Sequence, residues 1–330
     1  MKTLGQIKNK IVSDKKIFLF FLKLINFPLI GILYDSIYFR HIRKKVKTSD
    51  LTITIEPNNI CNLECVMCPY QHMTRPKKTM SLELFKKIVD EARGLGVKDI
   101  HLTQYNEPFT DKLIFERLRY IRSRGLTSSF YSNATLLTDS LIAKTLKDPP
   151  NLLRFSVDGV NKKTFESIRK GANFELVKDN IKKLVMERDR QGLKLPRIEV
   201  FFTILDANIG EAKAFLQEWK NVCDFISVYP ADSRESGNFV GLNYLKLKSY
   251  PCFQPKKVIV LSDGLVALCC VDIDGKIPLG DLNKQTLKEI FDSKIYKQTY
   301  ESQMNRVCKL DLCKNCSKGC IDSAFSWWIY

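Results

Sequence analysis

The stretch Cys61-Asn-Leu-Glu-Cys65-Val-Met-Cys68 places three cysteines in a C-x3-C-x2-C spacing. It follows an alternating apolar run, Leu51 to Pro57, and precedes a helix-like segment that starts near Ser81. Three thiolates can bind three irons of a four-iron, four-sulfur cube and leave the fourth iron open to a further ligand. The alternatives are three unrelated buried cysteines or a zinc knuckle, although zinc usually takes four ligands, often as two C-x2-C pairs.

Strand-like and helix-like segments alternate from Leu51 onward. Strands are expected at 51–56, 99–104, 127–132, 152–157, 198–205 and 224–229. Helices are expected at 81–95, 112–124, 138–147, 162–191 with a break at Gly171, and 209–219. Six such units predict an α/β fold with a parallel sheet and right-handed crossovers.

The cysteine stretch and the units around it resemble the radical S-adenosylmethionine (SAM) enzymes. In that family the open iron of a [4Fe-4S] cluster binds the amino and carboxylate groups of SAM, and an electron from the cluster cleaves SAM to methionine and a 5′-deoxyadenosyl radical. The resemblance implies a partial (β/α)6 TIM-like barrel over residues 51–230, with its chemistry at the carboxyl ends of the strands. It also implies a reducing electron donor such as flavodoxin or ferredoxin.

The segment Gln104-Tyr-Asn-Glu-Pro108 follows the second strand, where the family has a Gly-Gly-Glu-Pro turn that contacts the amino group of SAM. Glu107 and Pro108 match this turn, whereas Tyr105 and Asn106 replace the glycines. A carboxylate is a suitable acceptor for an ammonium group, but tyrosine exposes its backbone less readily than glycine does. The resemblance makes Tyr105, Asn106 and Glu107 candidate SAM-binding residues; the alternative is an ordinary strand-to-helix turn.

Further candidates follow the third, fourth and fifth strands. Asn133 lies where related enzymes contact SAM, and Ser156 belongs to a stretch, Phe155 to Gly159, that looks like the S-x-D-G of SPASM-containing relatives. Arg169 resembles the arginine that pairs with the SAM carboxylate, a task suited to its planar fork; a solvated helix charge is the alternative. Leu205, or its neighbour Ile204, is expected to pack on adenine, unless it belongs to the core.

The second group of cysteines resembles a SPASM/twitch extension, in which one Cys precedes a G-x4-C hairpin and a C-x2-C pair follows a helix. Gly264 to Cys269 fits the hairpin, and the helix is expected at 287–296. Cys270 competes with Cys269, because adjacent residues on a strand point to opposite faces. A zinc ribbon, or two auxiliary clusters that also use Cys308 and Cys320, remain alternatives. One auxiliary [4Fe-4S] cluster is favoured, with the ligands Cys252, Cys269, Cys313 and Cys316.

The composition limits the size of the domains, the redox environment and the kind of partner that can be expected. The chain has 330 residues, of which 45% are hydrophobic, so it is long enough for a large domain and a small one. Its eleven cysteines fall mostly in two local groups, which favours metal ligation in a reducing cytoplasm over a disulfide framework. The net charge is +17, yet no basic run with interleaved aromatics stands out, so a nucleic-acid partner is not favoured.

Residues 1–50 are expected to form a basic, apolar extension, with eleven Lys and Arg against three Asp, a balance of +8. The apolar run from Ile17 to Tyr34 contains Lys23 and Pro28, which argues against a membrane span of about 20 residues. Two interpretations stay open: association with the inner membrane surface, or packing across the bottom of the barrel. Residues 231–330 are expected to form a linker and the SPASM/twitch domain.

The twitch resemblance implies oxidation of a small molecule such as a sugar, cyclitol or lipid-linked compound, with the auxiliary cluster as electron acceptor. Asp232, Arg234 and Asp272 are the polar residues considered for proton transfer. One alternative is a SPASM maturase that modifies a peptide or protein. A non-catalytic iron–sulfur electron carrier is the other, and the intact cysteine triad with Glu107 argues against it.

Overall fold

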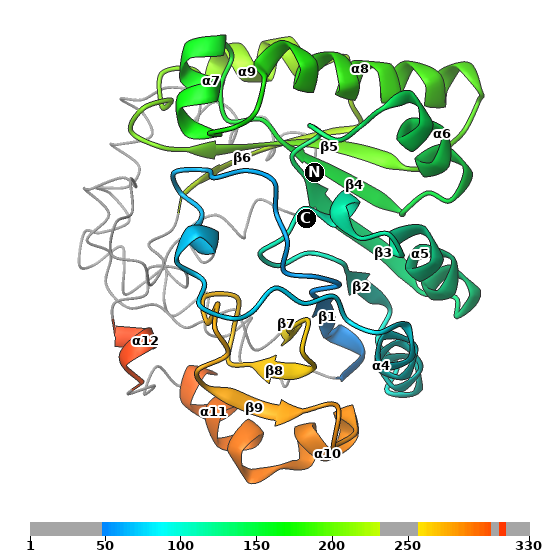
Figure 1. Cartoon of the computed structure of the whole chain (residues 1–330), viewed down its shortest axis with the longest axis vertical. Coiled ribbons are helices and arrows are strands. Elements are labelled where there is room, and N and C mark those ends of the chain that lie inside the picture. Colours follow the sequence, from blue (N-terminus) through cyan, green and yellow to red (C-terminus); the bar gives the residue numbers. More distant parts are fainter. Residues whose placement is uncertain (1–47, 232–256, 305–309, 315–330) are drawn as a thin grey trace, which may run out of the picture.

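The computed structural model describes residues 48–231, 257–304 and 310–314 (Figure 1). Nearly all of the N-terminal extension lies outside these ranges, as do four predicted site residues: Asp232, Arg234, Cys252 and Cys316. No helix within the described ranges is long and apolar enough to cross a membrane.

Six parallel strands form the body of the sheet and neighbour one another in chain order. A short 3-10 helix, η1 (Thr48–Asp50), leads into the first of them. The strands are β1 (Thr52–Ile55), β2 (Asp99–His101), β3 (Thr127–Ser132), β4 (Leu152–Ser156), β5 (Arg197–Ile204) and β6 (Phe225–Pro230). This order confirms the predicted α/β fold of strand–helix units.

The helices of these units lie along the outer side of the curved sheet, while the loop that carries the first three cysteines lies on the inner side (Figure 1). Two 3-10 turns, η2 (Pro69–His72) and η3 (Pro108–Thr110), follow β1 and β2. The outer helices are α4 (Leu82–Gly94), α5 (Ile114–Ser123), α6 (Asp139–Lys147), α7 (Lys162–Ile168), α8 (Phe174–Arg190) and α9 (Ala212–Trp219). The interruption predicted near Gly171 separates α7 from α8, and Gly171 itself adopts a φ of +92°.

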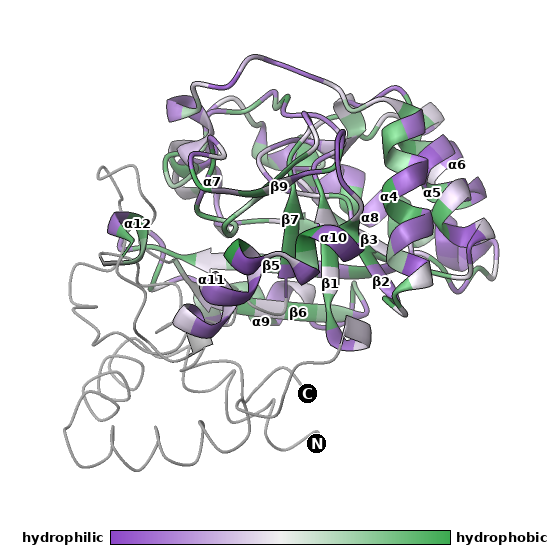
Figure 2. Cartoon of the chain, turned by 90° about the horizontal axis from the view of Figure 1, so that it is seen from below, coloured by the Kyte–Doolittle hydropathy of each residue, from purple (hydrophilic) through white to green (hydrophobic). Residues whose placement is uncertain are grey.

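Local sequence explains where these helices begin. Ser81, Thr138, Asn161 and Asn173 are N-caps whose side-chain oxygens accept a hydrogen bond from a backbone N–H in the first turn. Figure 2 shows hydrophilic and hydrophobic residues alternating around α4, α5 and α6, as expected for helices with one face on a core.

The two faces of the sheet differ in burial. Every second residue of β5 is buried, from Ile198 to Ile204, and faces the helices, while the residues between them are partly exposed or exposed. The partly exposed residues of β3 to β5 therefore point to the inner side of the sheet, the side on which the cysteine loop lies.

Three C-terminal strands extend the same sheet. β7 (Lys257–Val260) pairs with β1 in parallel, and β8 (Leu265–Ala267) and β9 (Pro278–Asp281) follow in antiparallel order. Gly264 turns the β7–β8 hairpin with a φ of +96°, and a Cβ there would meet Asn283 Nδ2 at 2.4 Å. The predicted hairpin is confirmed, and its strands are continuous with the barrel sheet.

The helix predicted at 287–296 is wrong in its extent. It divides into α10 (Leu287–Asp292) and α11 (Lys294–Met304), because Ser293 has extended backbone angles (φ −63°, ψ 149°). The Ser293 hydroxyl donates to the carbonyl of Ile290 at 2.7 Å and accepts the N–H of Tyr296 at 3.2 Å, so it ends one helix and caps the next. A short helix, α12 (Asp311–Lys314), follows.

Candidate functional site

The loop that carries Cys61, Cys65 and Cys68 is fixed at the carboxyl end of β1 by backbone hydrogen bonds. The N–H groups of Glu64 and Val66 donate to the carbonyls of Lys170 and Ile168, at 3.1 and 2.9 Å. These contacts tie the loop to the end of α7 and the turn after it, so residues a hundred positions apart in the chain form one wall of the site.

Tyr70 supports the first cysteine. Its hydroxyl accepts the N–H of Cys61 at 2.8 Å, and Lys77 Nζ donates to the same oxygen at 2.6 Å. The ammonium of Lys77 also lies 3.8 Å from the centre of the Tyr70 ring. Tyr70 was not among the predicted site residues; only its place two residues after Cys68 marks it.

The three thiols are free and close enough to influence one another. Burial is the main cause that raises the pKa of Cys61 to about 12; a backbone hydrogen bond opposes the shift, and Glu107 and the other two thiols add to it. Burial also raises the pKa of Cys65, although the nearby Arg169 lowers it. A soft cation that binds thiolates displaces these protons, so this triad fits an iron–sulfur cluster.

Arg169 lies beside the second cysteine. Its Nη1 donates to Cys65 Sγ at 3.7 Å, while Nε donates to a carboxylate oxygen of Asp158 at 2.7 Å. Burial acts to lower the pKa of the guanidinium, but Asp158 and Cys65 outweigh it and the pKa is raised. Arg169 is therefore a buried, positively charged group at the cysteine loop and not a solvated helix charge.

Asp158 is the residue that orients Arg169, and the prediction overlooked it. Its carboxylate is fully buried and also accepts the N–H of Thr203 at 2.6 Å. The signal was present in the sequence, since Asp158 belongs to the Phe155 to Gly159 stretch quoted for Ser156. The sequence did not reveal that Asp158 in this stretch pairs with Arg169 at the end of α7.

Glu107 is fully buried between β2 and β3. Its carboxylate accepts three hydrogen bonds, from Ser132 Oγ at 2.9 Å, from the N–H of Asn133 at 2.7 Å and from the N–H of Phe109 at 3.1 Å. Burial raises the pKa of Glu107 to about 7, against the lowering effect of these donors and of Arg169. The carboxylate thus joins the ends of two neighbouring strands close to the first cysteine.

In the turn before Glu107, the side chain of Asn106 bonds within the turn, whereas those of Gln104 and Tyr105 bond to the loop that carries Cys270. Asn106 Oδ1 accepts the N–H of Gln104 at 3.0 Å, and its buried Nδ2 has no hydrogen-bond partner in the part of the chain that the structure describes. The hydroxyl of Tyr105 and Gln104 Nε2 both donate to the carbonyl of Cys270. An unpaired buried donor at this turn fits a ligand that offers acceptor oxygens, as SAM does.

The remaining predicted SAM-binding residues follow the third, fourth and fifth strands. Asn133 Nδ2 donates to Asn62 Oδ1, within the cysteine loop, at 2.9 Å. Ser156 ends β4 on the half-exposed face, and its hydroxyl bonds to none of the described residues. Leu205 is fully buried in a small apolar cluster apart from the main core, formed with Ile168, Ala231, Val66 and Met67. Only Val66 and Met67 of this cluster remain partly exposed, so the expected contact of Leu205 with adenine stays a prediction.

The auxiliary cysteines lie only partly within the described ranges. Cys269 is 7% exposed in the main core, and Cys313 on α12 packs against the same core. The strand argument for choosing between Cys269 and Cys270 is wrong, because β8 ends at Ala267 and both cysteines lie in the turn that follows. Cys269 Sγ accepts the N–H of Val271 at 3.4 Å, as sulfur ligands of clusters commonly do.

Asp272 lies in this turn and is 1% exposed. Its carboxylate accepts the N–H groups of Lys276 and Ile277 at 2.8 and 3.1 Å, so it shapes the loop that follows Cys269. It is the one predicted proton-transfer residue that the described ranges include.

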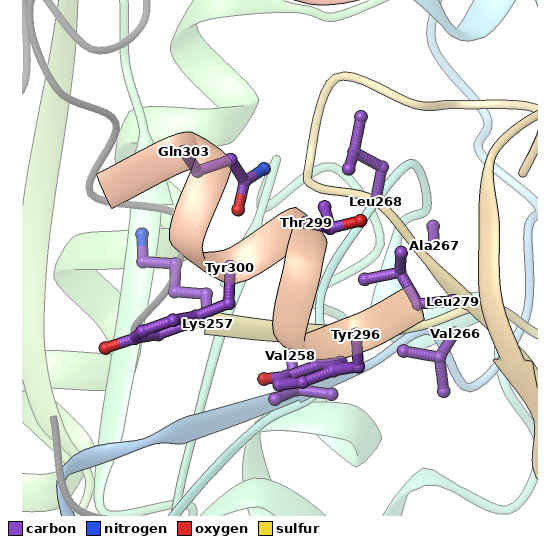
Figure 3. A pocket seen from close by; sticks show the side chains of 10 residues that line it. All are labelled: Lys257, Val258, Val266, Ala267, Leu268, Leu279, Tyr296, Thr299, Tyr300 and Gln303. Atoms are coloured by element: carbon purple, nitrogen blue, oxygen red, sulfur yellow. The ribbon is translucent and has the colours of Figure 1, made fainter. Parts of the chain in front are cut away.

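A small pocket lies between α11 and the strands β7, β8 and β9, and Figure 3 shows the side chains that line it. Aliphatic residues of the strands line it together with the polar side chains of Lys257, Thr299 and Gln303, and Tyr296 and Tyr300 come from α11. It includes none of the predicted site residues. In the described ranges, no three His, Cys, Asp or Glu side chains converge on a single metal position.

Two protein-family models match this chain. A model of the radical SAM superfamily matches residues 55–188, and a model of an iron–sulfur cluster-binding domain, SPASM, matches residues 252–317. The first match covers the cysteine loop, Glu107 and Arg169. The second covers all four predicted auxiliary ligands and ends before Cys320.

Individual relatives agree with these matches. The tungsten-containing aldehyde ferredoxin oxidoreductase cofactor-modifying protein of Pyrococcus furiosus is 31% identical over 47% of this chain, and the match spans only 44% of that protein. The antilisterial bacteriocin subtilosin biosynthesis protein AlbA of Bacillus subtilis is 25% identical over 80% of this chain and 65% of its own length. The crystal structure of BtrN in complex with AdoMet and 2-DOIA superimposes with a TM-score of 0.54 at 17% identity, covering 82% of this chain and 93% of BtrN, which supports the fold.

The two domain matches and the cysteine loop establish the cofactor set: a catalytic [4Fe-4S] cluster, SAM and an auxiliary iron–sulfur cluster. The buried thiols, the unpaired Asn106 amide and the apolar cluster around Leu205 are the features of this chain that fit them. The chain belongs to the radical SAM superfamily and carries a SPASM iron–sulfur domain at its C-terminal end.

Proposed function

We propose that this enzyme abstracts a hydrogen atom from a small molecule and oxidises it by two electrons. Cys61, Cys65 and Cys68 would hold the catalytic [4Fe-4S] cluster, whose chemistry when bound is the reductive cleavage of SAM to a 5′-deoxyadenosyl radical. The protein residues would bind SAM, keep water away from it and hold the substrate. The observation that carries the proposal is the convergence of the cysteine loop, Arg169 and Glu107 at the carboxyl ends of the parallel strands.

Each proposed SAM-binding residue has a polar atom or an apolar surface that could contact SAM. Arg169 uses Nε and Nη2 on Asp158, which leaves Nη1 beside Cys65 to reach a carboxylate. The unpaired Nδ2 of Asn106 and the hydroxyl of Ser156 can each bond to an oxygen-rich ligand. Leu205 and its apolar neighbours would cover the adenine.

The inner side of the sheet supports a compact substrate with both ring and polar groups. Phe201 lies between two tyrosines, with its ring centre 5.6 Å from that of Tyr131 and 5.4 Å from that of Tyr229. Arg154 crosses the Tyr131 ring at 5.1 Å and pairs with Glu199 at 2.8 Å. Small-molecule sites typically combine such an apolar wall with a few charged groups, which agrees with a sugar, cyclitol or lipid-linked substrate.

The auxiliary cluster would accept the electron that hydrogen abstraction leaves on the substrate. Cys252, Cys269, Cys313 and Cys316 can cap all four irons, so this cluster needs no substrate as a ligand. Asp232 remains the candidate that could accept the proton, whereas the guanidinium of Arg234 stays protonated and could only stabilise negative charge. The carboxylate of Asp272 is already held by two backbone N–H groups, which favours a role in shaping the loop.

A peptide substrate is the second candidate. It is favoured by the similarity to AlbA, a bacteriocin biosynthesis protein, which extends over 80% of this chain. The small-molecule proposal is favoured by the fold it shares with BtrN, whose solved complex contains AdoMet and 2-DOIA. The two candidates differ in the size of the molecule that donates the hydrogen atom.

Deuterium transfer separates the candidates. The anaerobic enzyme would be incubated with SAM, dithionite and extracts of cells grown in deuterated medium, separated by mass into fractions below and above about 1 kDa. Deuterium in 5′-deoxyadenosine from the light fraction would support the small-molecule proposal. Deuterium only from the heavy fraction would replace it with peptide modification. No 5′-deoxyadenosine in any incubation would refute both.

A further inference from the structure

The turn that replaces the family's two glycines contacts the loop of the auxiliary cluster directly. The Tyr105 side chain is 3% exposed, and its hydroxyl donates to the carbonyl of Cys270. Gln104 Nε2 donates to the same oxygen at 3.1 Å. One carbonyl next to Cys269 is thus held by two side chains from the turn that also carries Asn106 and Glu107.

The opposite end of the same loop is held by the segment that follows the catalytic cysteines. Asp274 Oδ1 accepts the N–H groups of Thr74 and Arg75 at 2.8 and 3.3 Å. Arg75 Nε donates to the carbonyl of Ile273 at 2.7 Å, and its two Nη atoms bond to the buried carboxylate of Glu56, each at 3.0 Å. Glu56 directly follows β1, so this end of the loop is anchored to the rigid sheet.

The two anchors differ in their connection to the SAM site. The anchor at Arg75 and Glu56 is a buried ion pair and has little freedom to move. The anchor at Tyr105 belongs to the turn in which Asn106 Oδ1 accepts the N–H of Gln104 and Asn106 Nδ2 has no described partner. A ligand that bonds to Asn106 Nδ2 would therefore contact a side chain that is already hydrogen-bonded to Gln104, one of the two residues that hold the carbonyl of Cys270.

We propose that Tyr105 and Gln104 are positioning residues that couple SAM binding to the order of the loop carrying Cys269. Binding of SAM at the turn would tighten the two hydrogen bonds to the Cys270 carbonyl and fix the backbone around the auxiliary ligand. Thermodynamic linkage is reciprocal: the factor by which SAM binding favours the ordered loop is also the factor by which an ordered loop raises the affinity for SAM. This inference rests on the proposed function only in requiring that SAM binds at the turn after β2.

Hydrogen–deuterium exchange of the anaerobic holoenzyme tests the coupling without any substrate. In the wild type, SAM should slow amide exchange in the turn 104–109 and, by about fivefold or more, in the loop 269–277, the scale expected for one hydrogen bond. Tyr105→Phe removes only the donor to Cys270 and should keep the effect in the turn while losing most of it in the loop.

Tyr120→Phe is the matched control. It removes the same atom from a residue whose hydroxyl donates to Asp90 at 2.7 Å and accepts from Arg124 at 2.7 Å, and neither partner belongs to the turn or to the loop. Its exchange pattern should equal that of the wild type. Gln104→Leu removes the second donor to Cys270 and should reduce the loop effect independently, which keeps the proposal testable if Tyr105→Phe does not fold.

The outcomes distinguish this inference from the proposed function. SAM protection confined to the turn in the wild type, or protection of the loop that survives in both Tyr105→Phe and Gln104→Leu, would overturn the coupling and leave SAM binding intact. Absence of SAM protection anywhere would instead overturn the proposed SAM site itself, and the coupling with it.

Discussion

Arg169 and Cys65 lie in contact, with Nη1 of the guanidinium 3.7 Å from Sγ of the thiol, although 104 positions separate them in the chain. Asp158 holds the other edge of the guanidinium. A positive charge at this place offsets the negative charge that thiolate ligands bring into a buried site.

Replacement of Arg169 by Lys tests this arrangement. Charge is kept, but the planar fork that bonds to Asp158 and a carboxylate at once is lost, so SAM affinity should fall by a factor corresponding to about 1–3 kcal/mol. Equilibrium binding of SAM to the anaerobic holoenzyme measures it. Arg190→Lys, on the exposed end of α8 beside Glu187, is the control and should bind like the wild type. Equal affinities in all three proteins would return Arg169 to a structural role.

Much of this site could be predicted from sequence because it is local. The spacing of three cysteines, the Glu107-Pro108 pair and the Ser156 to Gly159 stretch each lie within a few residues and at the end of a predicted strand. The strand bounds themselves agree to within a residue or two for β1 and β3 to β6, and burial alternates along β4 and β5.

The contacts between distant segments could not be predicted. The pairing of Arg169 with Asp158, the bond from Tyr105 to a carbonyl 165 positions away and the parallel pairing of β7 with β1 depend on how the chain folds back on itself. The break between α10 and α11 at Ser293 could not be predicted, because a serine within an otherwise helical run is as compatible with a continuous helix as with a helix cap. The residues beyond the described ranges, Asp232 and Arg234 among them, remain predictions.

Tyr70→Phe should loosen the catalytic cluster. The variant lacks the oxygen that accepts the N–H of Cys61 and receives Lys77 Nζ, so one ligand loses its backbone support. Partners of metal ligands typically contribute about 10–100-fold to metal affinity, and the anaerobic protein should release iron to a chelator faster than the wild type. Tyr120→Phe serves as the control. An unchanged rate of iron release would show that Tyr70 does not support the cluster.

His101 should remain neutral well below neutral pH. Burial of the imidazole ring and the nearby positive charges of Arg154 and Lys257 lower the pKa of His101 to about 3. The chain has three histidines, so loss of one imidazole signal in His101→Gln assigns its NMR resonance. That resonance should not titrate between pH 8 and 5; a midpoint near 6.5 would contradict the structure.

The same shift has a consequence for stability. The unfolded chain binds a proton on this residue near pH 6.5 and the native chain does not, so native stability should fall as pH decreases, by about 0.8 kcal/mol between pH 8 and 6. His101→Gln should lack this contribution. An equal pH dependence of unfolding in the two proteins would show that His101 is protonated equally in both states.

Replacement of Cys313 and Cys316 together by Ala should remove the auxiliary cluster alone. Iron should fall from about eight to about four per chain, since each cube holds four irons. SAM cleavage should continue while oxidised product is lost, because the electron acceptor is missing. Cys223→Ala, which changes a cysteine outside both groups, should keep about eight irons. Four irons and one zinc in the wild type would show the C-terminal site to be structural and would remove the proposed acceptor.

The formation of 5′-deoxyadenosine by the cysteine loop tests the central claim most directly. The wild type, Cys223→Ala and the triple variant Cys61→Ala, Cys65→Ala, Cys68→Ala would each be incubated anaerobically with SAM and dithionite. Wild type and Cys223→Ala should form 5′-deoxyadenosine, and the triple variant should form none while holding about four fewer irons. Full SAM cleavage by the triple variant would contradict the account, because the cluster that these cysteines are proposed to hold would then not be its source.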